Sequence, residues 1–254
     1  MQTRDDPAEG AAARPRSLDT ARRRARARAA PGLRGLAGVL AGSVQCARTA
    51  DQVVALTFDD GPDPCATPGV LAALERHGAK ATFFVLTAAA EAHPELVGRM
   101  LAAGHEVGLH GGEHVPLGRA SLRRSADVVW RGHRRLTRIT GTPARWFRPP
   151  CGSQNLRSYA VARAAGMQVV SWTADAADWR PLDLDACVAR AAAGLAPGAI
   201  VLLHDRPQPE GACVPGELAD RVLEATAARG LRAVALGEML RGRPAVRAAW
   251  FKPR

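Results

Sequence analysis

Two adjacent carboxylates end an apolar run that begins at Val53. The segment from Val53 to Pro62 reads VVALTFDDGP, which places Asp59 and Asp60 directly after a phenylalanine. β-Branched and aromatic residues favour a buried strand, and the Gly-Pro pair ends it. Neighbouring carboxylates in such a place repel each other unless a cation or a buried partner holds them. A simple turn is the alternative interpretation, because Asp-Gly-Pro is also good turn chemistry.

Residues of matching chemistry follow Asp59 and Asp60 along the chain. Two histidines with a His-x-x-x-His spacing and a distant aspartate can hold a metal and leave positions open for water and substrate. One carboxylate of the pair would then bind the metal, and the other would act as a base toward a water molecule whose pKa the metal lowers. A later histidine could protonate a leaving group, oriented by an aspartate, while an arginine pairs with the base. This set predicts metal-assisted hydrolysis of an amide or ester. Besides Asp59 and Asp60, this set of residues contains His110, His114, Arg148, Asp178 and His204.

The chain from residue 51 alternates short apolar strands with helices. Pro or Asn starts and Gly stops predict helices, and these cover residues 68–77, 94–103, 155–165 and 217–229, with a longer basic helix over 121–140. This alternation predicts an α/β fold with a parallel sheet covered by helices, and the number of units favours a closed or nearly closed barrel. The expected strands cover residues 53–59, 81–86, 106–110, 145–148, 168–173, 199–204 and 231–236.

The unusual polar residues all fall where an expected strand ends. Asp59 ends the first strand, His110 the third and His204 the sixth, while Arg148 and Asp178 come just after the fourth and fifth. Barrels of this kind carry their active sites at the carboxyl ends of the strands. Scattered surface charges would not gather at one end, so the placement indicates a single site.

Charge and composition limit the other classes of function. The formal net charge is +11, but residues 1–50 alone contain ten Arg and only four acids. The remainder is mildly basic, so we expect no specific nucleic-acid partner for the folded part. Hydrophobic residues make up 47% of the chain and aromatic residues only 4%, so Ala, Val and Leu must fill most of the core.

We divide the chain into a disordered Arg/Ala-rich segment over 1–50, a catalytic domain over 51–245 and a tail over 246–254. Arginines over 22–28, a weakly apolar run over 36–44 and small residues after it have the outline of an export signal. The run is too short to span a membrane. A secreted or cell-envelope protein is therefore expected, with a cytoplasmic one as the alternative. A basic tail for polyanions and an over-extended translation start also remain open.

The five cysteines contain no Cys-x-x-Cys pair, which argues against a cysteine zinc cluster. An odd number excludes complete internal pairing. A bridge between Cys65 and Cys151 near the mouth of the site and a pair of buried thiols are both open. The remaining cysteines are Cys46, Cys187 and Cys213.

Five motifs in this order, TFDDGP, HxxxH, RPPxG, DxxDW and LxH, resemble those of the polysaccharide deacetylases. This family is carbohydrate esterase family four, with the nodulation-protein-B homology domain. The likeness spans roughly residues 51–240 and includes KATFFV and GHEVG. It implies a distorted, TIM-like (β/α) barrel of about seven strands and a divalent metal, usually zinc and sometimes cobalt or nickel. It also implies removal of acetyl groups from N-acetylglucosamine in peptidoglycan or chitin oligomers, or from acetylated xylan.

The resemblance also implies a role for each matching residue in metal binding and proton transfer. Asp59 would be the catalytic base and Asp60 the metal ligand beside it. His110 and His114 would complete the metal site. His204 would be the general acid.

Supporting and substrate-binding roles follow from the remaining motifs. Arg148 would orient Asp59, and Asp178 would orient His204. Trp179 and Leu202 would line the acetyl pocket. The backbone N–H of Cys151, together with the metal, would stabilise the tetrahedral oxyanion.

Three positions depart from the family pattern. Cys151 stands where an aromatic residue is usual, Gly111 replaces a Ser or Thr, and Leu109 replaces an Asn. The first change keeps a backbone donor but alters contacts with the sugar, and the second removes a hydroxyl that would brace the metal loop. We therefore expect an active enzyme with altered substrate preference.

Two other functions remain as hypotheses. One is deacylation or deformylation of a small sugar-containing metabolite or lipid-linked sugar, suggested by the altered Cys151 loop. The other is a basic polyanion-binding protein in which the Arg-rich tail makes the contact and the barrel is inert.

Overall fold

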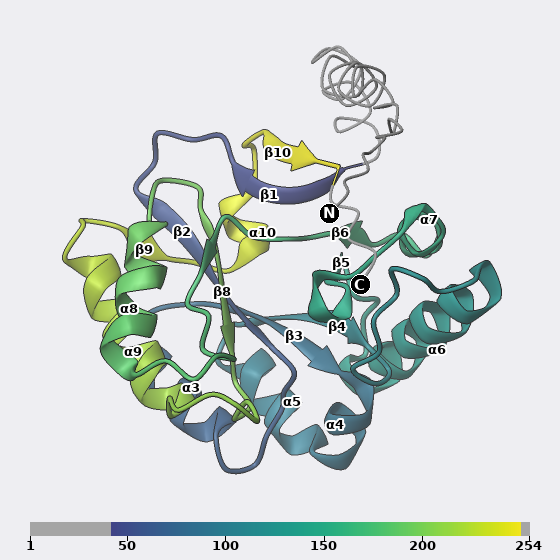
Figure 1. Ribbon diagram of the computed structural model, residues 1–254, viewed down its shortest axis with the longest axis horizontal. Helices are drawn as coiled ribbons and strands as arrows, with labels where there is room; N and C mark the ends of the chain where they lie inside the picture. The colour runs from purple at the N-terminus through teal and green to yellow at the C-terminus, as the bar shows by residue number, and fades with distance from the viewer. Residues whose placement is uncertain (1–41, 250–254) are drawn as a thin grey trace, which may run out of the picture. The chain divides into compact units, whose positions relative to one another are not determined.

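The strand β2 (Val53–Asp59) lies at the centre of the main sheet in the computed structural model, which describes residues 42–249 (Figure 1). The strands follow the order β6-β5-β4-β3-β2-β8-β7, and every neighbouring pair along it is parallel. The short strand β9 (Arg232–Ala233) pairs with the start of β2. The sheet curls into a half-barrel, as the sequence predicted. Its other strands are β3 (Thr82–Leu86), β4 (Glu106–Gly111), β5 (Trp146–Phe147), β6 (Gln168–Val169), β7 (Ala174–Asp175) and β8 (Ile200–His204).

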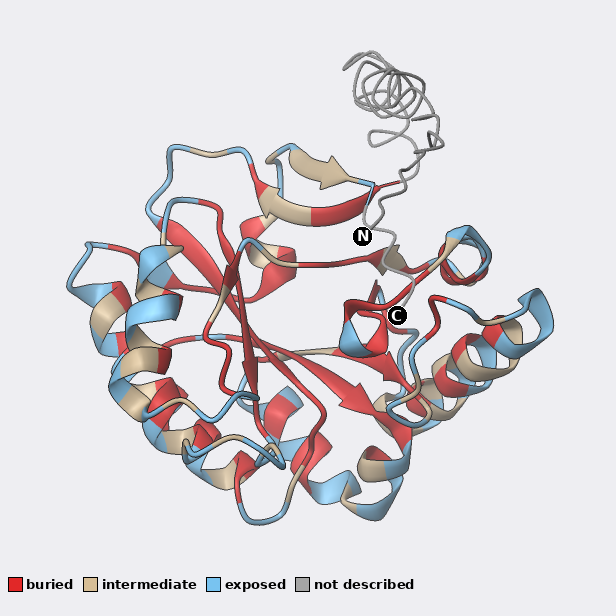
Figure 2. Cartoon of the chain, viewed as in Figure 1, coloured by how far each residue is buried: buried red, intermediate tan, exposed pale blue. Residues whose placement is uncertain are grey.

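Helices cover the outer face of the sheet, with their apolar sides inward and their polar sides exposed (Figure 2). Ser121 caps the start of the long helix α6 (Leu122–Thr140), where its hydroxyl accepts a hydrogen bond from the Arg124 N–H at 3.2 Å, and Gly141 follows the helix in the left-handed conformation. The other helices are α3 (Thr67–Arg76), α4 (Thr87–Ala92), α5 (Pro94–Ala102), α7 (Leu156–Ala164), α8 (Leu184–Ala193), α9 (Pro215–Ala227) and α10 (Leu236–Met239).

Alternation along β2 determines which side chains reach the inside of the barrel. Its even-numbered residues pack against the helices, whereas Val53 and Ala55 belong to a second cluster on the inner face. Thr57 and Asp59 continue this inner row, because side chains two residues apart share a face of a strand. The inner face is therefore apolar at the start of β2 and polar at its carboxyl end.

The expected strands and helices are found with shifts of a few residues, apart from two strands. The predicted strand 168–173 divides into β6 and β7, which lie at opposite edges of the sheet. The chain crosses the open side of the half-barrel between them, so residues 170–173 cannot continue one strand. The predicted strand 231–236 is shortened to β9, because Leu236 begins α10. Helices α4, α8 and α10 were not predicted.

A two-stranded sheet corrects the predicted domain boundaries. Strand β1 (Ser43–Ala47) pairs antiparallel with β10 (Ala245–Ala248), which joins parts of the segments assigned to a disordered N-terminus and a tail. Isolated bridges link Val44 to Val170, which follows β6, and Cys46 to Ala199, which precedes β8, so β1 joins segments from the two sides of the half-barrel. The pairing is long-range, and the local composition did not indicate it. The expectations for residues 1–41, including most of the export signal, lie outside the described residues.

Within residues 42–249, we find no helix with both the length and the apolar character that crossing a membrane requires.

Removing β10 tests whether the two-stranded sheet supports the barrel. Each net hydrogen bond contributes about 0.5–1.5 kcal/mol, so truncation after Pro244 should lower the free energy of unfolding by about 1–3 kcal/mol relative to a chain ending at Ala249. Urea denaturation measures the difference. Equal stability of the two truncated chains would show that β10 contributes nothing.

Candidate active site

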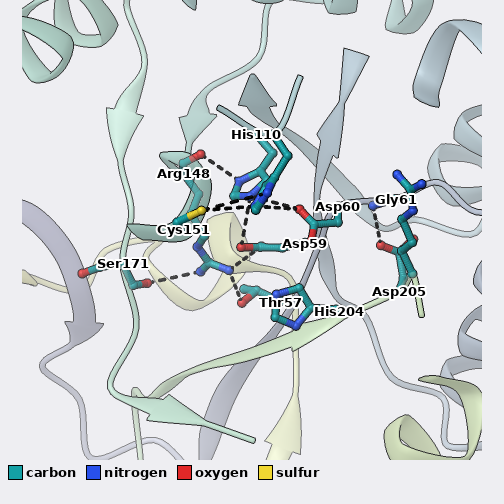
Figure 3. Close-up of polar contacts among 12 residues, drawn as sticks. Thr57, Asp59, Asp60, Gly61, His110, Arg148, Cys151, Ser171, His204 and Asp205 are labelled. Carbon is teal, nitrogen blue, oxygen red and sulfur yellow. Dashed lines mark hydrogen bonds and ion pairs between the residues drawn. The ribbon is translucent and has the colours of Figure 1, made fainter. Parts of the chain in front are cut away.

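Five strands bring the predicted polar residues together at one end of the sheet, the end where the parallel strands finish. Figure 3 shows the polar contacts among several of them. Asp59 and His204 are directly opposite each other in the register of β2 and β8. His110 lies near the end of β4, Arg148 follows β5, and Asp178 follows β7. The parallel arrangement therefore places all of these residues at the carboxyl ends of the strands, as expected from the sequence.

A buried ion pair lies at the base of the site. The guanidinium of Arg148 has no exposed surface and donates from one nitrogen to Asp59 Oδ1 and to Thr57 Oγ1, each at 2.8 Å. Its second terminal nitrogen donates to the Ser171 carbonyl at 3.2 Å, and its charge lies 4.1 Å from the centre of the Phe84 ring. Burial lowers the pKa of Arg148, and the charge of Asp59 opposes this shift. The pair fixes Asp59 through Oδ1 and leaves Oδ2 toward His110 Nε2, 3.8 Å away.

Asp60, His110 and His114 form a group suited to a metal ion. One potential ligand atom from each lies within 4.8 Å of the others. Asp60 Oδ1 is 3.3 Å from His110 Nε2 and 3.4 Å from His114 Nε2. Two nitrogen or oxygen ligands about 2.0–2.2 Å from one zinc ion are about 3.4 Å apart in a tetrahedral arrangement. Asp60 Oδ1 is also buried without a hydrogen-bond partner, so the residues fit a divalent metal.

The protonation states of this group also favour a metal. Burial opposes ionisation of Asp60, but the neighbouring ring of His110 and the charges of His204 and His114 hold its pKa below the usual range. Burial lowers the pKa of His114, which favours the neutral imidazole. A neutral imidazole and an ionised carboxylate are the forms that bind metals. His110 Nδ1 lies 2.9 Å from the Arg148 carbonyl, a contact that orients the ring with Nε2 toward Asp60.

His204 and Asp178 form a second buried pair across the site. The Nδ1 atom of His204 is 2.8 Å from Asp178 Oδ1, and the His204 backbone N–H donates to Oδ2 at 2.9 Å. Burial alone would lower the pKa of His204, but the charge and hydrogen bond of Asp178, with the charges of Asp59 and Asp60, raise it to about 9. His204 is therefore protonated at neutral pH, as a general acid must be.

Asp205 holds the turn that follows Asp60. Its two carboxylate oxygens accept from the Gly61 N–H at 3.0 Å and from the Thr67 hydroxyl at 2.7 Å. A Cβ atom at Gly61 would lie 2.1 Å from Asp205 Oδ2, so only glycine fits there. Burial raises the pKa of Asp205 to about 7. These contacts give Asp205 a structural role.

Backbone strain is concentrated at this site. Over residues 42–249, the non-glycine residues with positive φ are Asp60 at 77°, Cys151 at 55° and Ala177 at 54°. Each such conformation costs about 1–3 kcal/mol unless the surroundings impose it. Ala177 directly precedes Asp178, so all three lie at or beside proposed functional residues. The fold accepts this cost at the predicted metal ligand Asp60, at the predicted donor Cys151 and beside Asp178, the partner of His204.

The sequence did not single out Gln208 or Thr57. Gln208 donates to Asp60 Oδ2 at 3.1 Å from the loop after β8, and Thr57 accepts from Arg148. Gln208 stands in a Pro- and Gly-rich stretch without periodicity, so no local signal marks it. Thr57 could have been found from the alternation of β2, which puts it on the same face as Asp59.

The three predicted substrate-binding residues lie in different surroundings. Leu202 is buried on β8 opposite Thr57. The Cys151 Sγ lies 3.8 Å from His114 Nε2, at the edge of the metal group. Trp179 is 36% exposed and stacks with the guanidinium of Arg180. In the chain, Trp179 directly follows Asp178, which pairs with His204.

Gly111 adopts φ of 117°, a conformation that side chains rarely take. The glycine that stands here in place of the family's Ser or Thr therefore suits the backbone conformation of this chain. All five cysteines lie within the described residues, and no disulfide joins them, so Cys65 and Cys151 form no bridge.

Comparisons with known proteins agree with this geometry. The pattern of the polysaccharide deacetylase family matches residues 47–170. A chitooligosaccharide deacetylase from Bradyrhizobium sp. is 38% identical over 175 residues, which cover 68% of this chain and 80% of that protein. The peptidoglycan-N-acetylglucosamine deacetylase PgdA of Listeria monocytogenes is 39% identical over 152 residues, 60% of this chain. The match spans only 32% of the length of the Listeria protein.

Solved structures of the same family share the fold. The Bc1960 peptidoglycan N-acetylglucosamine deacetylase superposes with a TM-score of 0.74 at 26% identity, over 84% of this chain and 96% of that one. A CE4-family pseudoenzyme from Bacillus anthracis superposes with a TM-score of 0.71 at 26% identity, over 79% and 69% of the two chains. The chain belongs to the polysaccharide deacetylase family. Because this fold also occurs in a pseudoenzyme, activity has to be argued from the residues of the site.

Replacing Asp59 with alanine should destabilise the fold as well as change the chemistry. The substitution leaves the buried charge of Arg148 without its carboxylate, and breaking such a pair costs about 3–5 kcal/mol. Urea denaturation should show a loss of that size for Asp59→Ala and a smaller loss for Asp59→Asn, which keeps an oxygen acceptor. The exposed Asp185→Asn is the control, with a change below about 0.5 kcal/mol. Wild-type stability of Asp59→Ala would contradict the energetic role of the pair.

Replacing Asp178 with asparagine should change the pH dependence of activity. The Asp178 charge raises the pKa of His204, so its removal lowers that pKa and deprotonates the acid at a lower pH. The alkaline limb of the kcat/KM profile should therefore shift to lower pH, with activity better retained at pH 6 than at pH 8. A uniform loss at every pH would mean that Asp178 only supports the structure.

Proposed function

We propose that this chain is a metal-dependent deacetylase that hydrolyses the N-acetyl group of N-acetylglucosamine residues in peptidoglycan or chitin-type oligomers. The observation that carries the proposal is Asp60 Oδ1, which is buried, has no hydrogen-bond partner and lies between His110 and His114. The names of the relatives support the substrate class, since one is a chitooligosaccharide deacetylase and another acts on peptidoglycan. Acetylated xylan, in which the acetyl group forms an ester and not an amide, is the alternative substrate.

Asp60, His110 and His114 would hold the metal, with zinc favoured and cobalt or nickel as alternatives, because imidazole and carboxylate ligands suit these ions. When bound, the metal polarises the acetyl carbonyl and lowers the pKa of a water molecule beside it. The contact of His110 Nδ1 with a backbone carbonyl and the hydrogen bond of Gln208 to Asp60 keep two of the ligands in position.

The base and the acid would act from opposite sides of the site. Asp59 is fixed by Arg148 through Oδ1, so Oδ2 takes a proton from the water that attacks the acetyl carbon. His204 is fixed by Asp178 through Nδ1, so its Nε2 proton goes to the amine nitrogen as the C–N bond breaks. The products are acetate and a free amine. The backbone N–H of Cys151 would stabilise the oxyanion, and Trp179 and Leu202 would contact the acetyl group.

The substrate class also leads to a proposed location. Peptidoglycan lies outside the cytoplasmic membrane, so we place the protein in the cell envelope or outside the cell. The basic and apolar order of residues 22–44 supports export.

Acetate release from N-acetylglucosamine oligomers tests the proposed function. Metal-stripped protein should be inactive, and addition of zinc or cobalt should restore release. Asp59→Asn should reduce kcat by about 100-fold or more, the usual contribution of general base catalysis, while the exposed Asp185→Asn should remain active. Release without metal, or full activity of Asp59→Asn, would overturn the mechanism. Stoichiometric metal binding with no acetate release would overturn the assigned substrate.

A further inference from the structure

The metal group is buried on one side and exposed on the other. Asp60 and His110 have almost no exposed surface, whereas the side chain of His114 is 43% exposed. Any additional protein ligand must therefore approach from the side of His114. Cys151 lies on this side, in the loop after β5, and its thiol is exposed.

The Cys151 thiol lies beside the metal group, next to the ring of His114. Its Sγ atom is 3.8 Å from Nε2 and 4.0 Å from Nδ1 of His114. A sulfur 2.3 Å and a nitrogen about 2.0–2.1 Å from one zinc ion are about 3.6 Å apart at the tetrahedral angle. The observed separation is close to this value, although Sγ lies outside the group of three whose ligand atoms all fall within 4.8 Å.

One feature points to a cation at this place, and a second describes how the Cys151 side chain is directed. Asp60 Oδ1 is buried, unpartnered and aimed at the space between His110 and His114. The backbone of Cys151 adopts the left-handed conformation, with φ of 55°, which costs about 1–3 kcal/mol in a residue with a Cβ atom. This conformation sets the direction in which the side chain leaves the loop, and the Sγ atom stands against the His114 ring.

We propose that the Cys151 thiolate is a fourth protein ligand of the metal held by Asp60, His110 and His114. The inference rests on the metal site of the proposed function. For the sulfur to bind the ion, the exposed Cys151 side chain rotates about χ1 toward Asp60. The thiol loses its proton to solvent on binding. A thiolate is a soft ligand, so this centre prefers zinc and cadmium over manganese and magnesium. One sulfur, two imidazole nitrogens and one carboxylate oxygen would then bind the ion, and a fifth position would remain for water or the acetyl oxygen.

Cobalt substitution tests the proposal without relying on activity. A thiolate bound to Co²⁺ gives an intense sulfur-to-metal charge-transfer absorption in the near ultraviolet, which imidazole and carboxylate ligands do not give. The full chain loaded with one cobalt ion should show this band, and so should Cys65→Ser, which removes the other exposed thiol. Cys151→Ser should bind cobalt without the band, and its Kd for zinc should rise by about 10- to 100-fold, the range for a lost supporting contact at a metal site.

Alkylation of the unmodified chain gives a second measurement that needs no variant. Iodoacetamide labelling followed by peptide mapping should show zinc slowing the reaction of Cys151 by about tenfold or more, while Cys65 reacts at the same rate with and without zinc. Bound cobalt without the charge-transfer band, or equal labelling of Cys151 with and without zinc, would overturn the thiolate ligand and leave the proposed function intact. Absence of metal binding in every variant would overturn both.

Discussion

The buried ion pair between Arg148 and Asp59 is the interaction on which the active-site end of the barrel depends. A guanidinium without exposed surface is costly unless a carboxylate compensates it, and here the compensating carboxylate is the proposed catalytic base. The arginine also ties the end of β2 to Ser171, which lies between β6 and β7 on the open side of the half-barrel. Stability and catalysis therefore rest on the same contact.

The register of the sheet arranges the proposed acid and the proposed base as a matched pair. Asp59 and His204 are neighbours across β2 and β8, and each is held by one charged partner from the strand connections, Arg148 or Asp178. Each partner binds one atom of the carboxylate or imidazole, so the other oxygen or nitrogen is directed into the site. Such preorganisation reduces the reorganisation that the reaction would otherwise require. The metal group lies beside this pair on β4 and the turn after β2.

The site is rigid on its buried side and open toward His114 and Cys151. Asp205 and Gln208 fix the turn that carries Asp60, and the Arg148 carbonyl fixes His110. The exposed side is formed by the loops after β4 and β5, where this chain departs from its family at Gly111 and Cys151. Variation in such loops changes specificity without disturbing the strands that hold the chemistry.

The sequence by itself determined most strands of the main sheet, most of the helices and the types of residue at the strand ends. These follow from local hydrophobic periodicity and from caps and breakers, which act over a few residues. Only the tertiary structure decided that Asp59 lies opposite His204, that Arg148 is fully buried, that β1 pairs with β10, and that Gln208 reaches Asp60. These contacts join segments far apart in the chain, so they depend on the packing of the whole barrel and leave no local pattern.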